Sequence, residues 1–442
     1  MRLFEELKDK IVNRRCNIGV LGLGYVGLPM AALFADKGFR VLGGDISESV
    51  VEKVNAGVSP VKESGMDELM GRAVGKGLLS TTTDVKEVVR VSDVLLVVVQ
   101  TPIGDDKKPD LAALRNACST VASDPSGKLV IVESTLPPGT THETIIPILE
   151  SSDNKAGEDF YLVYSPERAM PTRLLEEIQS NPRIIGGLTE ESSELASLLY
   201  GNITTGQLVT TEIEIAEVVK VLENTYRDVN IALANEIAML CEKLGVDAVK
   251  AIEIANKHPR VHLLSPGPGV GGHCIPKDPY FALDSARKHG LELRIISSAR
   301  KVNEAMPGHV LGLIEKALGS AGKKLEDSKI AILGVTYKGD TNDTRGSPSR
   351  DIVQSLLPLS EVFSHDPLAN QDFGGNFSKD MDEAVKDADC VVVVADHMEY
   401  ANLDLDRLSR LVKKPGVIVD GRRILDPEDA REKGFSYFGI GY

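Results

Sequence analysis

Short apolar runs alternate with helical segments along the first half of the chain. The runs lie within residues 16–21 and at 39–43, 94–99, 129–132 and 161–164. Residues 28–37, between the first two runs, have helical composition and end at Gly38. Apolar strands separated by helices are typical of a parallel sheet in an α/β fold, so this pattern predicts a βαβ opening and a parallel sheet.

A long helix is predicted after this sheet, because residues 211–244 contain neither proline nor glycine. Unbroken, such a helix would be about 50 Å long, which exceeds one small domain. We expect it to bridge two domains and to pair with its copy in another subunit. Lys220 and Asn224 share one face of it, and Arg227 continues this polar stripe. The alternative is an ordinary solvated face, but apolar residues crowd the other sides of the helix.

The last third of the chain repeats the first. Residues 329–339 echo 17–27, residues 389–394 echo 93–98, and residues 416–420 echo 129–133. In the echo of the glycine-rich turn, Gly334 and Gly339 keep the outer positions, whereas Thr336 replaces the middle glycine and Lys338 adds a positive charge. The predicted fold class is therefore α/β, with two Rossmann-like doubly wound domains joined by a long central helix and a helical dimerisation segment.

We expect three parts: an N-terminal domain at 1–208, a central helical segment at 209–308 and a C-terminal domain at 309–442.

The first turn has the glycine spacing of a dinucleotide site. Gly22, Gly24 and Gly27 follow a strand and open a helix, and Asp45 ends the next strand, 18 residues after the last glycine. Such glycines permit a tight turn and close approach to a pyrophosphate, and such an acid binds ribose hydroxyls, which favours NAD over NADP. The alternative is a glycine turn in some other α/β protein.

Polar residues end three further strands. Thr101, Thr135 and Glu167 follow the apolar runs at 94–99, 129–132 and 161–164. Ligands of open parallel sheets bind beyond the carboxyl ends of the strands, so these side chains are candidates for contact with cofactor or substrate. Each could instead be a simple turn or helix cap, the commoner role of Ser and Thr.

One cysteine stands in a glycine-rich stretch, residues 267–278, which contains four glycines before Cys274. His273 and Lys277 could favour its thiolate, and Asp278 is a neighbouring acid or base. The plain alternative is a surface loop in which the cysteine is incidental.

Composition narrows the function classes. A net charge of −15 makes non-specific binding to nucleic acid or to an anionic membrane surface unfavourable. The five cysteines are odd in number and have no CxxC spacing, so neither a disulfide framework nor a metal site is predicted. Neither a leader nor a membrane-spanning run is recognised, and we expect a cytoplasmic protein.

The motifs together resemble the UDP-glucose/GDP-mannose dehydrogenase family of nucleotide-sugar 6-dehydrogenases over nearly the whole chain. They are GLGYVG at 22–27, QTP at 100–102, ESTLPPGT at 133–140, SPER at 165–168, GGHCIPKD at 271–278, YKGDTNDTR at 337–345 and DGRR at 420–423. The resemblance implies a four-electron oxidation of a sugar C6 alcohol to a carboxylate with reduction of two NAD. It also implies a homodimer or higher homo-oligomer, with NAD binding by residues 1–208, dimerisation and the cysteine loop in 209–308, and UDP-sugar binding by 309–442.

The resemblance further implies roles for single residues. Cys274 would form a thiohemiacetal and then a thioester, with Lys220 and Asn224 stabilising oxyanions, Asp278 organising a water and Glu167 serving thioester hydrolysis. The division of proton transfer among Lys220, Asp278 and Glu167 stays open. The NAD contacts implied are Gly22, Gly24, Gly27, Asp45, Thr101, Thr135 and Arg345. The nucleotide-sugar contacts implied are Arg168, Lys220, Asn224, Arg260, Lys338 and Arg422.

Two positions depart from the family pattern. The spacing from Arg260 to Cys274 is shorter than in relatives where that arginine reaches a neighbouring subunit's site. Val50 stands where some relatives have an arginine directed at adenosine.

The segment 165–173 bears on the choice of sugar. Arg168 and Pro171 resemble the UDP-N-acetylhexosamine group, as does His273. Against this, Lys277 resembles the glucose type, and Ala169, Met170 and Thr172 do not match the pattern of the N-acetylhexosamine group. We expect UDP-N-acetyl-D-mannosamine as substrate, then UDP-N-acetylglucosamine or -galactosamine, then UDP-glucose. The rival functions are a two-electron hydroxyacid dehydrogenase and a non-catalytic sensor of NAD and nucleotide sugars.

Overall fold

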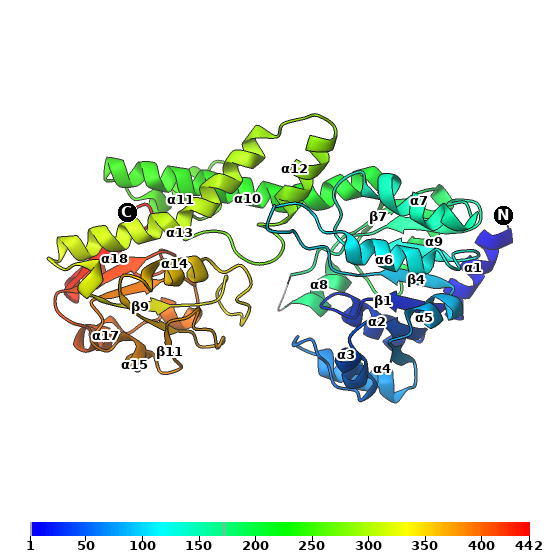
Figure 1. Cartoon of the computed structure of the whole chain (residues 1–442), viewed down its shortest axis with the longest axis horizontal. Helices are drawn as coiled ribbons and strands as arrows, with labels where there is room; N and C mark the ends of the chain where they lie inside the picture. Colours follow the sequence, from blue (N-terminus) through cyan, green and yellow to red (C-terminus); the bar gives the residue numbers. More distant parts are fainter. Residues whose placement is uncertain (1, 171–172) are drawn as a thin grey trace. The chain divides into compact units, whose positions relative to one another are not determined.

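A computed structural model describes residues 2–170 and 173–442, which form two compact units. Unit 1 comprises Met1–Glu223 and Tyr280–Leu291, and unit 2 comprises Asn224–Pro279 and Glu292–Tyr442. Each unit is built on one sheet of mainly parallel strands flanked by helices (Figure 1). The predicted fold class, two Rossmann-like α/β sheets and a long helix, is confirmed.

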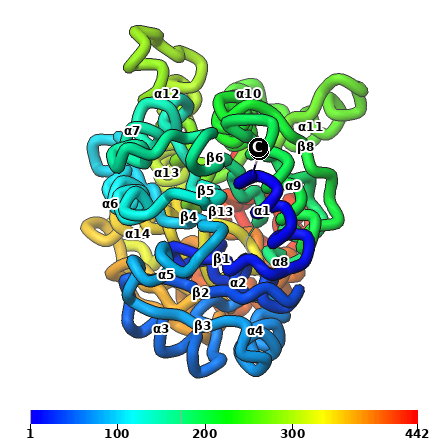
Figure 2. The backbone as a smooth tube through the Cα atoms, turned by 90° about the vertical axis from the view of Figure 1, so that its right-hand side faces the viewer, coloured from blue at the N-terminus to red at the C-terminus, as the bar shows by residue number. Residues whose placement is uncertain are grey.

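Unit 1 holds eight strands in the order β3-β2-β1-β4-β5-β6-β7-β8. Figure 2 shows the first six of them one after another along the sheet. The strands are β1 Asn17–Leu21, β2 Arg40–Gly44, β3 Leu79–Thr82, β4 Val94–Val97, β5 Leu129–Val132, β6 Tyr161–Tyr164, β7 Arg183–Gly187 and β8 Leu208–Glu212. Only the β6–β7 pair among them is antiparallel. The strand order reverses beside β1, which is where open parallel sheets bind ligands.

The helices of unit 1 cover both faces of its sheet. They are α1 Arg2–Val12, α2 Gly27–Asp36, α3 Glu48–Asn55, α4 Met66–Gly75, α5 Val85–Val91, α6 Ala112–Val121, the π-helix η1 Thr141–Ile145, α7 Ile146–Leu149, the 3₁₀ turn η2 Glu150–Ser152, α8 Leu174–Ser180 and α9 Glu190–Tyr200. Alternate strand residues enter two separate cores: Val94 and Leu96 lie in one, Leu95 and Val97 in the other. A strand buried on both faces is apolar throughout, which explains the unbroken runs in the sequence.

The long helix α10 (Ile213–Leu244) begins in unit 1, directly after β8, and continues in unit 2. It starts two residues later than the absence of proline and glycine suggested, because Thr211 and Glu212 still pair with β7. Helix α12 (Asp278–Lys288) is likewise shared between the units.

Unit 2 holds six strands in the order β11-β10-β9-β12-β13-β14, all parallel. The strands are β9 Lys329–Leu333, β10 Glu361–His365, β11 Asn376–Ser378, β12 Cys390–Val393, β13 Gly416–Asp420 and β14 Phe435–Gly439. Its further helices are α11 Ala248–Ala255, α13 Arg294–Ser320, the 3₁₀ turn η3 Leu325–Asp327, α14 Pro348–Leu356, α15 Met381–Val385, α16 Met398–Ala401, α17 Leu405–Leu411 and α18 Pro427–Glu432.

The two halves of the internal repeat predicted from the sequence share an equivalent hydrogen bond. Asp93 accepts a hydrogen bond from the amide of Asn17 at 2.8 Å in unit 1, and Asp389 accepts one from the amide of Lys329 at 3.0 Å in unit 2. In both units the acid precedes the fourth strand of the repeat and fixes the start of the first.

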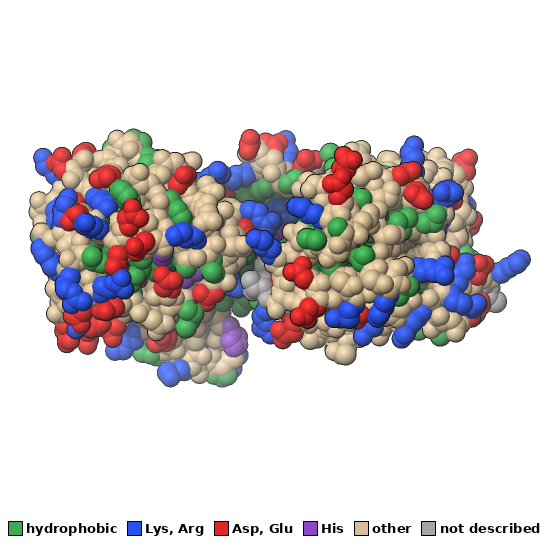
Figure 3. All heavy atoms as spheres, turned by 90° about the horizontal axis from the view of Figure 1, so that it is seen from below, with side chains coloured by type: hydrophobic (Ala, Val, Ile, Leu, Met, Phe, Trp, Pro, Cys, Tyr) green, Lys and Arg blue, Asp and Glu red, His purple; other side chains and the backbone are tan. Residues whose placement is uncertain are grey.

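The surface carries charges of both signs. Figure 3 shows acidic and basic side chains interspersed over the face in view, so the net charge of −15 is not gathered there into one acidic patch. Among the helices of the described residues, none is both long and apolar enough to cross a membrane.

Candidate active site

The glycine-rich turn of unit 1 follows β1 and opens α2. Gly22 has a φ of +96°, and a Cβ at that position would lie 2.4 Å from the carbonyl oxygen of Val98. A Cβ at Gly27 would lie 1.9 Å from the carbonyl oxygen of Gly22, so this turn requires glycine at both ends. A Cβ at Gly24 would meet nothing within 4 Å, which leaves the middle of the turn open to a ligand.

Asp45 ends β2 and is tied to the glycine turn. Its carboxylate accepts hydrogen bonds from the amides of Leu23 at 2.8 Å and Ser47 at 2.9 Å. A carboxylate oxygen has further lone pairs, so Asp45 can still accept from ribose hydroxyls. Ile46, beside it, is 93% exposed.

Thr101 and Thr135 come together beyond the ends of the paired strands β4 and β5. The hydroxyl of Thr101 donates to the carbonyl oxygen of Thr135 at 2.8 Å, and the hydroxyl of Ser134 donates to that of Val99 at 2.7 Å. Thr101 is buried and Thr135 is half-buried. The glycine turn, Asp45 and these threonines all lie at the carboxyl edge of one sheet, and this set of donors and this open turn fit a dinucleotide.

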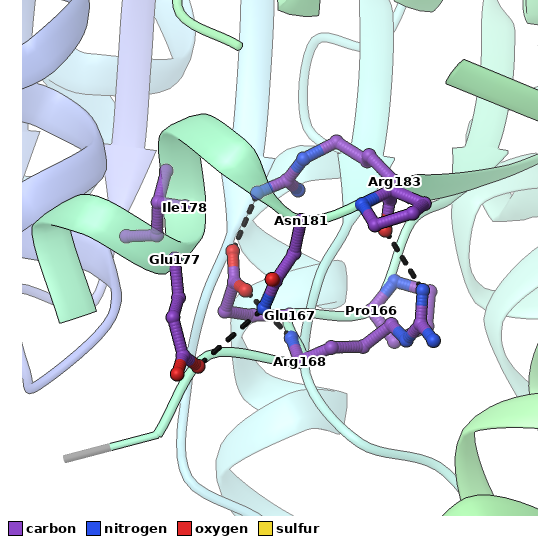
Figure 4. Close-up of a pocket in the computed structure, with 8 residues that line it drawn as sticks. Pro166, Glu167, Arg168, Glu177, Ile178, Asn181 and Arg183 are labelled. Carbon is purple, nitrogen blue, oxygen red and sulfur yellow. Dashed lines mark hydrogen bonds and ion pairs between the residues drawn. The ribbon is translucent and has the colours of Figure 1, made fainter. Parts of the chain in front are cut away.

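Glu167 follows β6 and is held at both carboxylate oxygens. One oxygen accepts from the amides of Arg168 at 2.6 Å and Ala169 at 2.8 Å. The other lies 2.5 Å from Nη2 of Arg183, at the start of β7 (Figure 4). Arg183 was missed in the sequence, because it belongs to no motif and its partner is found only in the fold. A guanidinium and two amides therefore hold this carboxylate in one orientation.

Arg183 also faces a second carboxyl group, that of Glu133 at the end of β5. Its Nη1 lies 3.7 Å from Oε1 of Glu133, and its guanidinium lies 4.3 Å from the ring centre of Tyr200. Tyr200 donates to the same Oε1 at 2.6 Å, and Oε2 has no hydrogen-bond partner among the described residues. Burial raises the pKa of Glu133 to about 7, against the lowering effect of the Arg183 charge.

Arg168, the residue that bears on the sugar, pairs within unit 1. Its Nε donates to Glu223 at 2.9 Å, and its Nη2 contacts the other oxygen of Glu223. Its Nη1 donates to the carbonyl oxygen of Pro182 at 2.8 Å (Figure 4). These contacts use three of its five N–H groups. Pro171 and Thr172, which also bear on the choice of sugar, lie outside the described residues.

Lys220 lies on α10 and is buried, with 7% of its surface exposed. One turn earlier, the buried Glu217 accepts hydrogen bonds from the amides of Gly139 at 2.6 Å and Thr141 at 2.8 Å. Glu217 thus anchors this part of α10 to the loop that carries Thr135. Burial raises the pKa of Glu217.

Asn224 follows Lys220 by one helical turn and belongs to unit 2. Its Nδ2 donates to Oδ2 of Asp278 at 2.6 Å, and Asp278 is 1% exposed. The amide of Asp278 donates to the carbonyl oxygen of Cys274 at 2.9 Å, which places the acid at the first turn of α12. Nζ of Lys277 lies 3.9 Å from Oδ1 of Asp278. Unit 2 therefore brings Cys274, Asp278 and Asn224 into one cluster.

The loop before Cys274 is packed closely. The amide of Gly272 donates to the carbonyl oxygen of Arg345 at 3.0 Å. A Cβ at Gly271 would lie 2.5 Å from Cβ of Tyr337, so a larger residue does not fit there. Cys274 is half-buried, whereas Cys16, Cys118, Cys241 and Cys390 are buried.

The residues of unit 2 that were predicted to contact NAD or the nucleotide sugar differ in exposure and in hydrogen-bond partners. Arg345 is paired with Asp343, its Nη2 lying 2.6 Å from the carboxylate, and Lys338 is exposed. Burial alone raises the pKa of Asp343, but the bonds and charge of Arg345 leave that pKa below its ordinary value. Arg422 donates to the carbonyl oxygens of Val394 at 2.8 Å and Tyr337 at 2.9 Å. Arg260 is exposed, and it lies 14 residues before Cys274 along the chain.

The glycine-rich turn of unit 2 is closed where that of unit 1 is open. Asp366 corresponds to Asp45, but it is fully buried and accepts from Nε2 of His397 at 3.1 Å. The Thr336 hydroxyl lies 2.9 Å from the same nitrogen, and Nδ1 of His397 accepts from the amide of Asp340 at 3.0 Å. His397 therefore occupies the hydrogen-bonding side of Asp366, which leaves this acid less accessible than Asp45.

Lys220, Glu167 and Arg168 belong to unit 1, and Cys274, Asp278 and Asn224 belong to unit 2. Within residues 2–170 and 173–442, no group of three or more His, Cys, Asp or Glu side chains is arranged to hold a metal ion.

Three family models cover most of the chain. They are the NAD-binding domain (residues 16–204), the central domain (214–305) and the UDP-binding domain (331–427) of the UDP-glucose/GDP-mannose dehydrogenase family. The UDP-N-acetyl-D-mannosamine dehydrogenase of Pyrococcus horikoshii is 42% identical to the chain over 428 residues, which is 96% of this chain and 99% of that protein. The chain belongs to the UDP-glucose/GDP-mannose dehydrogenase family. The family resemblance predicted from its motifs is thereby confirmed.

Other relatives name more than one sugar. An NDP-N-acetyl-D-galactosaminuronic acid dehydrogenase of Ralstonia nicotianae is 37% identical over 89% of this chain and 94% of its own. The solved structure of the P. horikoshii enzyme matches with a TM-score of 0.90 at 41% identity, over 96% of this chain and 99% of that one. A UDP-glucose dehydrogenase from Pyrobaculum islandicum matches with a TM-score of 0.85 at 29% identity, over 97% and 98%.

As a member of this family, the chain is an NAD-dependent nucleotide-sugar dehydrogenase, an oxidoreductase. The prediction of this enzyme class from the sequence is confirmed, and so is an NAD-type cofactor. A UDP-binding domain supports a UDP-sugar as substrate.

Proposed function

We propose that the enzyme oxidises C6 of a UDP-N-acetylhexosamine, in first place UDP-N-acetyl-D-mannosamine, to the uronic acid in a four-electron reaction. The observation that carries the proposal is Cys274. It alone among five described cysteines is not buried, and it stands on a closely packed loop beside Asp278. A two-electron dehydrogenase has no use for such a thiol.

The thiol accounts for the passage from aldehyde to acid. After the C6 alcohol has lost its first hydride and a proton, the sulfur of Cys274 adds to the aldehyde carbon and a C–S bond forms. Loss of the second hydride, from carbon, and of the hydroxyl proton turns this thiohemiacetal into a thioester. Water then breaks the C–S bond, which returns the thiol and releases the carboxylate. Covalent capture keeps the aldehyde from leaving between the two oxidations.

Lys220, Asn224 and Asp278 would serve the oxygen at C6. A buried ammonium stabilises an alkoxide or tetrahedral oxyanion strongly, because little water competes for it. The 2.6 Å bond from Asn224 orients the carboxylate of Asp278, which can then hold a water for proton transfer.

Glu167 would take a proton from the water that hydrolyses the thioester. Its contacts with Arg183 and with the amides of Arg168 and Ala169 fix the carboxylate, which supports this role because a base must be held close to the water that it activates.

Gly22, Gly24, Gly27, Asp45, Thr101 and Thr135 would hold the NAD, with Arg345 as a further contact. NAD, when bound, accepts the hydride in each oxidation. The ionised Asp45 would disfavour the 2′-phosphate of NADP.

Arg168, Lys338, Arg422 and Arg260 would contact the nucleotide sugar. Three N–H groups of Arg168 bond Glu223 and Pro182, so two remain that could donate to a diphosphate or acetamido oxygen. The names of the relatives also favour N-acetylated sugars. UDP-N-acetylglucosamine or -galactosamine is the second candidate, and UDP-glucose the third.

We also propose a homodimer or higher homo-oligomer formed through α10. In the single chain, α10 exposes seven large apolar side chains at helical spacing, which form an apolar stripe: Ile215, Val218, Leu222, Tyr226, Leu233, Leu240 and Leu244. Such a stripe on a soluble helix is costly unless a partner covers it. We further propose that the chain divides into functional domains at 1–208, 209–308 and 309–442. We also propose a cytoplasmic location, which would keep the five cysteines reduced.

The proposal is tested by NADH formation with UDP-N-acetylmannosamine, UDP-N-acetylglucosamine, UDP-N-acetylgalactosamine and UDP-glucose in parallel. We expect the highest kcat/KM with UDP-N-acetylmannosamine. Substantial turnover of UDP-glucose with none of the N-acetylated sugars would contradict the sugar assignment. No turnover with any of the four would favour the non-catalytic sensor.

A further inference from the structure

A chain of four buried polar side chains ends on the cysteine loop of unit 2. Nη1 of Arg300 donates to Oδ1 of Asp228 at 2.6 Å, and Nδ2 of Asn303 donates to the same oxygen at 2.9 Å. Nδ2 of Asn235 donates to Oδ1 of Asn303 at 3.0 Å. Oδ1 of Asn235 accepts from the amide of Gly267 at 2.9 Å. Two helices, α10 and α13, thus hold the first glycine of the loop.

The direction of this chain is set at its ends. A backbone amide can only donate, so Asn235 must present its oxygen to Gly267 and its NH₂ to Asn303. Asn303 must then present its NH₂ to Asp228, whose carboxylate can only accept while ionised. Burial raises the pKa of Asp228, and the charge of Arg300 opposes this. Each member therefore determines the orientation of the next.

The chain is shielded from water. Asn235 and Asp228 are fully buried, Asn303 is 1% exposed and Arg300 is 4% exposed. Removal of one member leaves a buried donor or acceptor without its partner, which costs about 1–3 kcal/mol. The Gly267 end of the loop would then be free to move.

Asn256 holds the segment that precedes this loop, through exposed hydrogen bonds. Asn256 exchanges two hydrogen bonds with the backbone of Leu263, accepting from its amide at 2.8 Å and donating to its carbonyl oxygen at 2.9 Å. These bonds are exposed, and they lie further from Cys274 along the chain. Asn256 therefore offers a matched control: the same residue type and the same kind of contact at a more distant position.

We propose that Asn235 is a positioning residue for Cys274, and that the chain of side chains from Arg300 to Asn235 sets the place of the thiol through the Gly267 amide. This inference rests on the proposed role of Cys274. The loop is fixed at Gly267 on one side of the cysteine, and by the bonds of Gly272 and Asp278 on either side of it. Displacement of a reacting group by about 1 Å can cost about a hundredfold in rate.

The test compares Asn235→Ala with Asn256→Ala in the full-length enzyme. For Asn235→Ala we expect kcat to fall by about tenfold or more, with the Kd for NAD unchanged, because the dinucleotide turn lies in unit 1. For Asn256→Ala we expect both values to stay within about twofold of wild type. A loss of kcat shared equally by both variants would overturn the inference.

A second readout separates displacement of the loop from general loss of structure. Each variant is treated with iodoacetamide, and the alkylation rate of each cysteine is followed by peptide mass spectrometry. We expect Cys274 of Asn235→Ala to react about threefold faster or more, since the released loop exposes the thiol. Cys16, Cys118, Cys241 and Cys390 are buried and should remain as slow as in wild type. Faster alkylation of all five would indicate unfolding and would contradict the inference.

Cys274→Ala distinguishes failure of this inference from failure of the proposed function. If Cys274→Ala is inactive while Asn235→Ala behaves like Asn256→Ala, only the positioning role is wrong. If Cys274→Ala keeps full turnover, the proposed thioester chemistry is wrong, and the positioning role falls with it.

Discussion

Glu133 allows a prediction whose magnitude follows from the structure. Its carboxyl group is fully enclosed in unit 1, with Tyr200 and Arg183 beside one oxygen and no hydrogen-bond partner at the other among the described residues. Burial raises its pKa from 4.5 to about 7. We therefore expect Glu133 to be protonated in the folded protein up to nearly neutral pH, and Glu133→Gln to mimic that neutral form.

The effect of the substitution should depend on pH. Below pH 4.5 Glu133 is protonated in both the folded and the unfolded state, and its ionisation does not affect stability. As the pH rises from 4.5 to about 7, the unfolded state ionises while the folded state stays protonated, so wild type loses stability, and above pH 7 the loss is complete. At 1.36 kcal/mol per pKa unit, the loss is about 3 kcal/mol at alkaline pH. Glutamine cannot ionise, so the folding stability of the variant does not fall with pH for this reason.

Thermal unfolding of both proteins between pH 5 and pH 9 measures the effect. One kcal/mol changes the Tm of a domain of this size by about 2–4 °C. Because about 0.8 kcal/mol is already lost at pH 5, the Tm of Glu133→Gln minus that of wild type should rise by about 5–10 °C over this range. The charge contact with Arg183 exists only when Glu133 is ionised, and its lowering effect is already contained in the pKa of about 7.

The exposed Glu158 provides a control in the same unit. Glu158→Gln should follow wild type at every pH. If the difference for Glu133→Gln is flat between pH 5 and pH 9, or falls, then Glu133 is ionised in the fold and our account of the buried pair around Arg183 is wrong.

Three further predictions concern ligands and assembly. Gly24→Ala should leave the Tm unchanged, since a Cβ there meets no protein atom, and should raise the Kd for NAD about tenfold or more; an unchanged Kd in a calorimetric titration would contradict the assignment of this turn. Asp45→Asn should reduce the ratio of kcat/KM for NAD to that for NADP about tenfold or more, and an unchanged ratio would remove Asp45 from cofactor selection. Leu233→Glu should shift the protein to monomers in light scattering by placing a charge in the apolar stripe of α10, whereas Leu359→Glu, at an exposed leucine outside α10, should not.

The sequence predicted the features that depend on local spacing. The glycines at 22, 24 and 27 with Asp45 indicated the first nucleotide turn, and the echo of that turn at 329–339 indicated the second sheet. Such motifs are visible because one turn of backbone requires a particular residue at each position.

Features that depend on distant partners could not be predicted. Arg183 meets Glu167 and Glu133 only because β5, β6 and β7 are neighbours in the sheet, and no spacing along the chain reports that. The burial of Asp366 under His397 was equally hidden, since the sequence shows only that an acid follows a strand.

The measurement that tests the central claim most directly is the number of NADH molecules formed per molecule of UDP-N-acetylmannosamine consumed to completion. The account predicts two, with the uronic acid as the only sugar product, and with little or no turnover for Cys274→Ala. One NADH per sugar, with the aldehyde accumulating and Cys274→Ala as active as wild type, would contradict it.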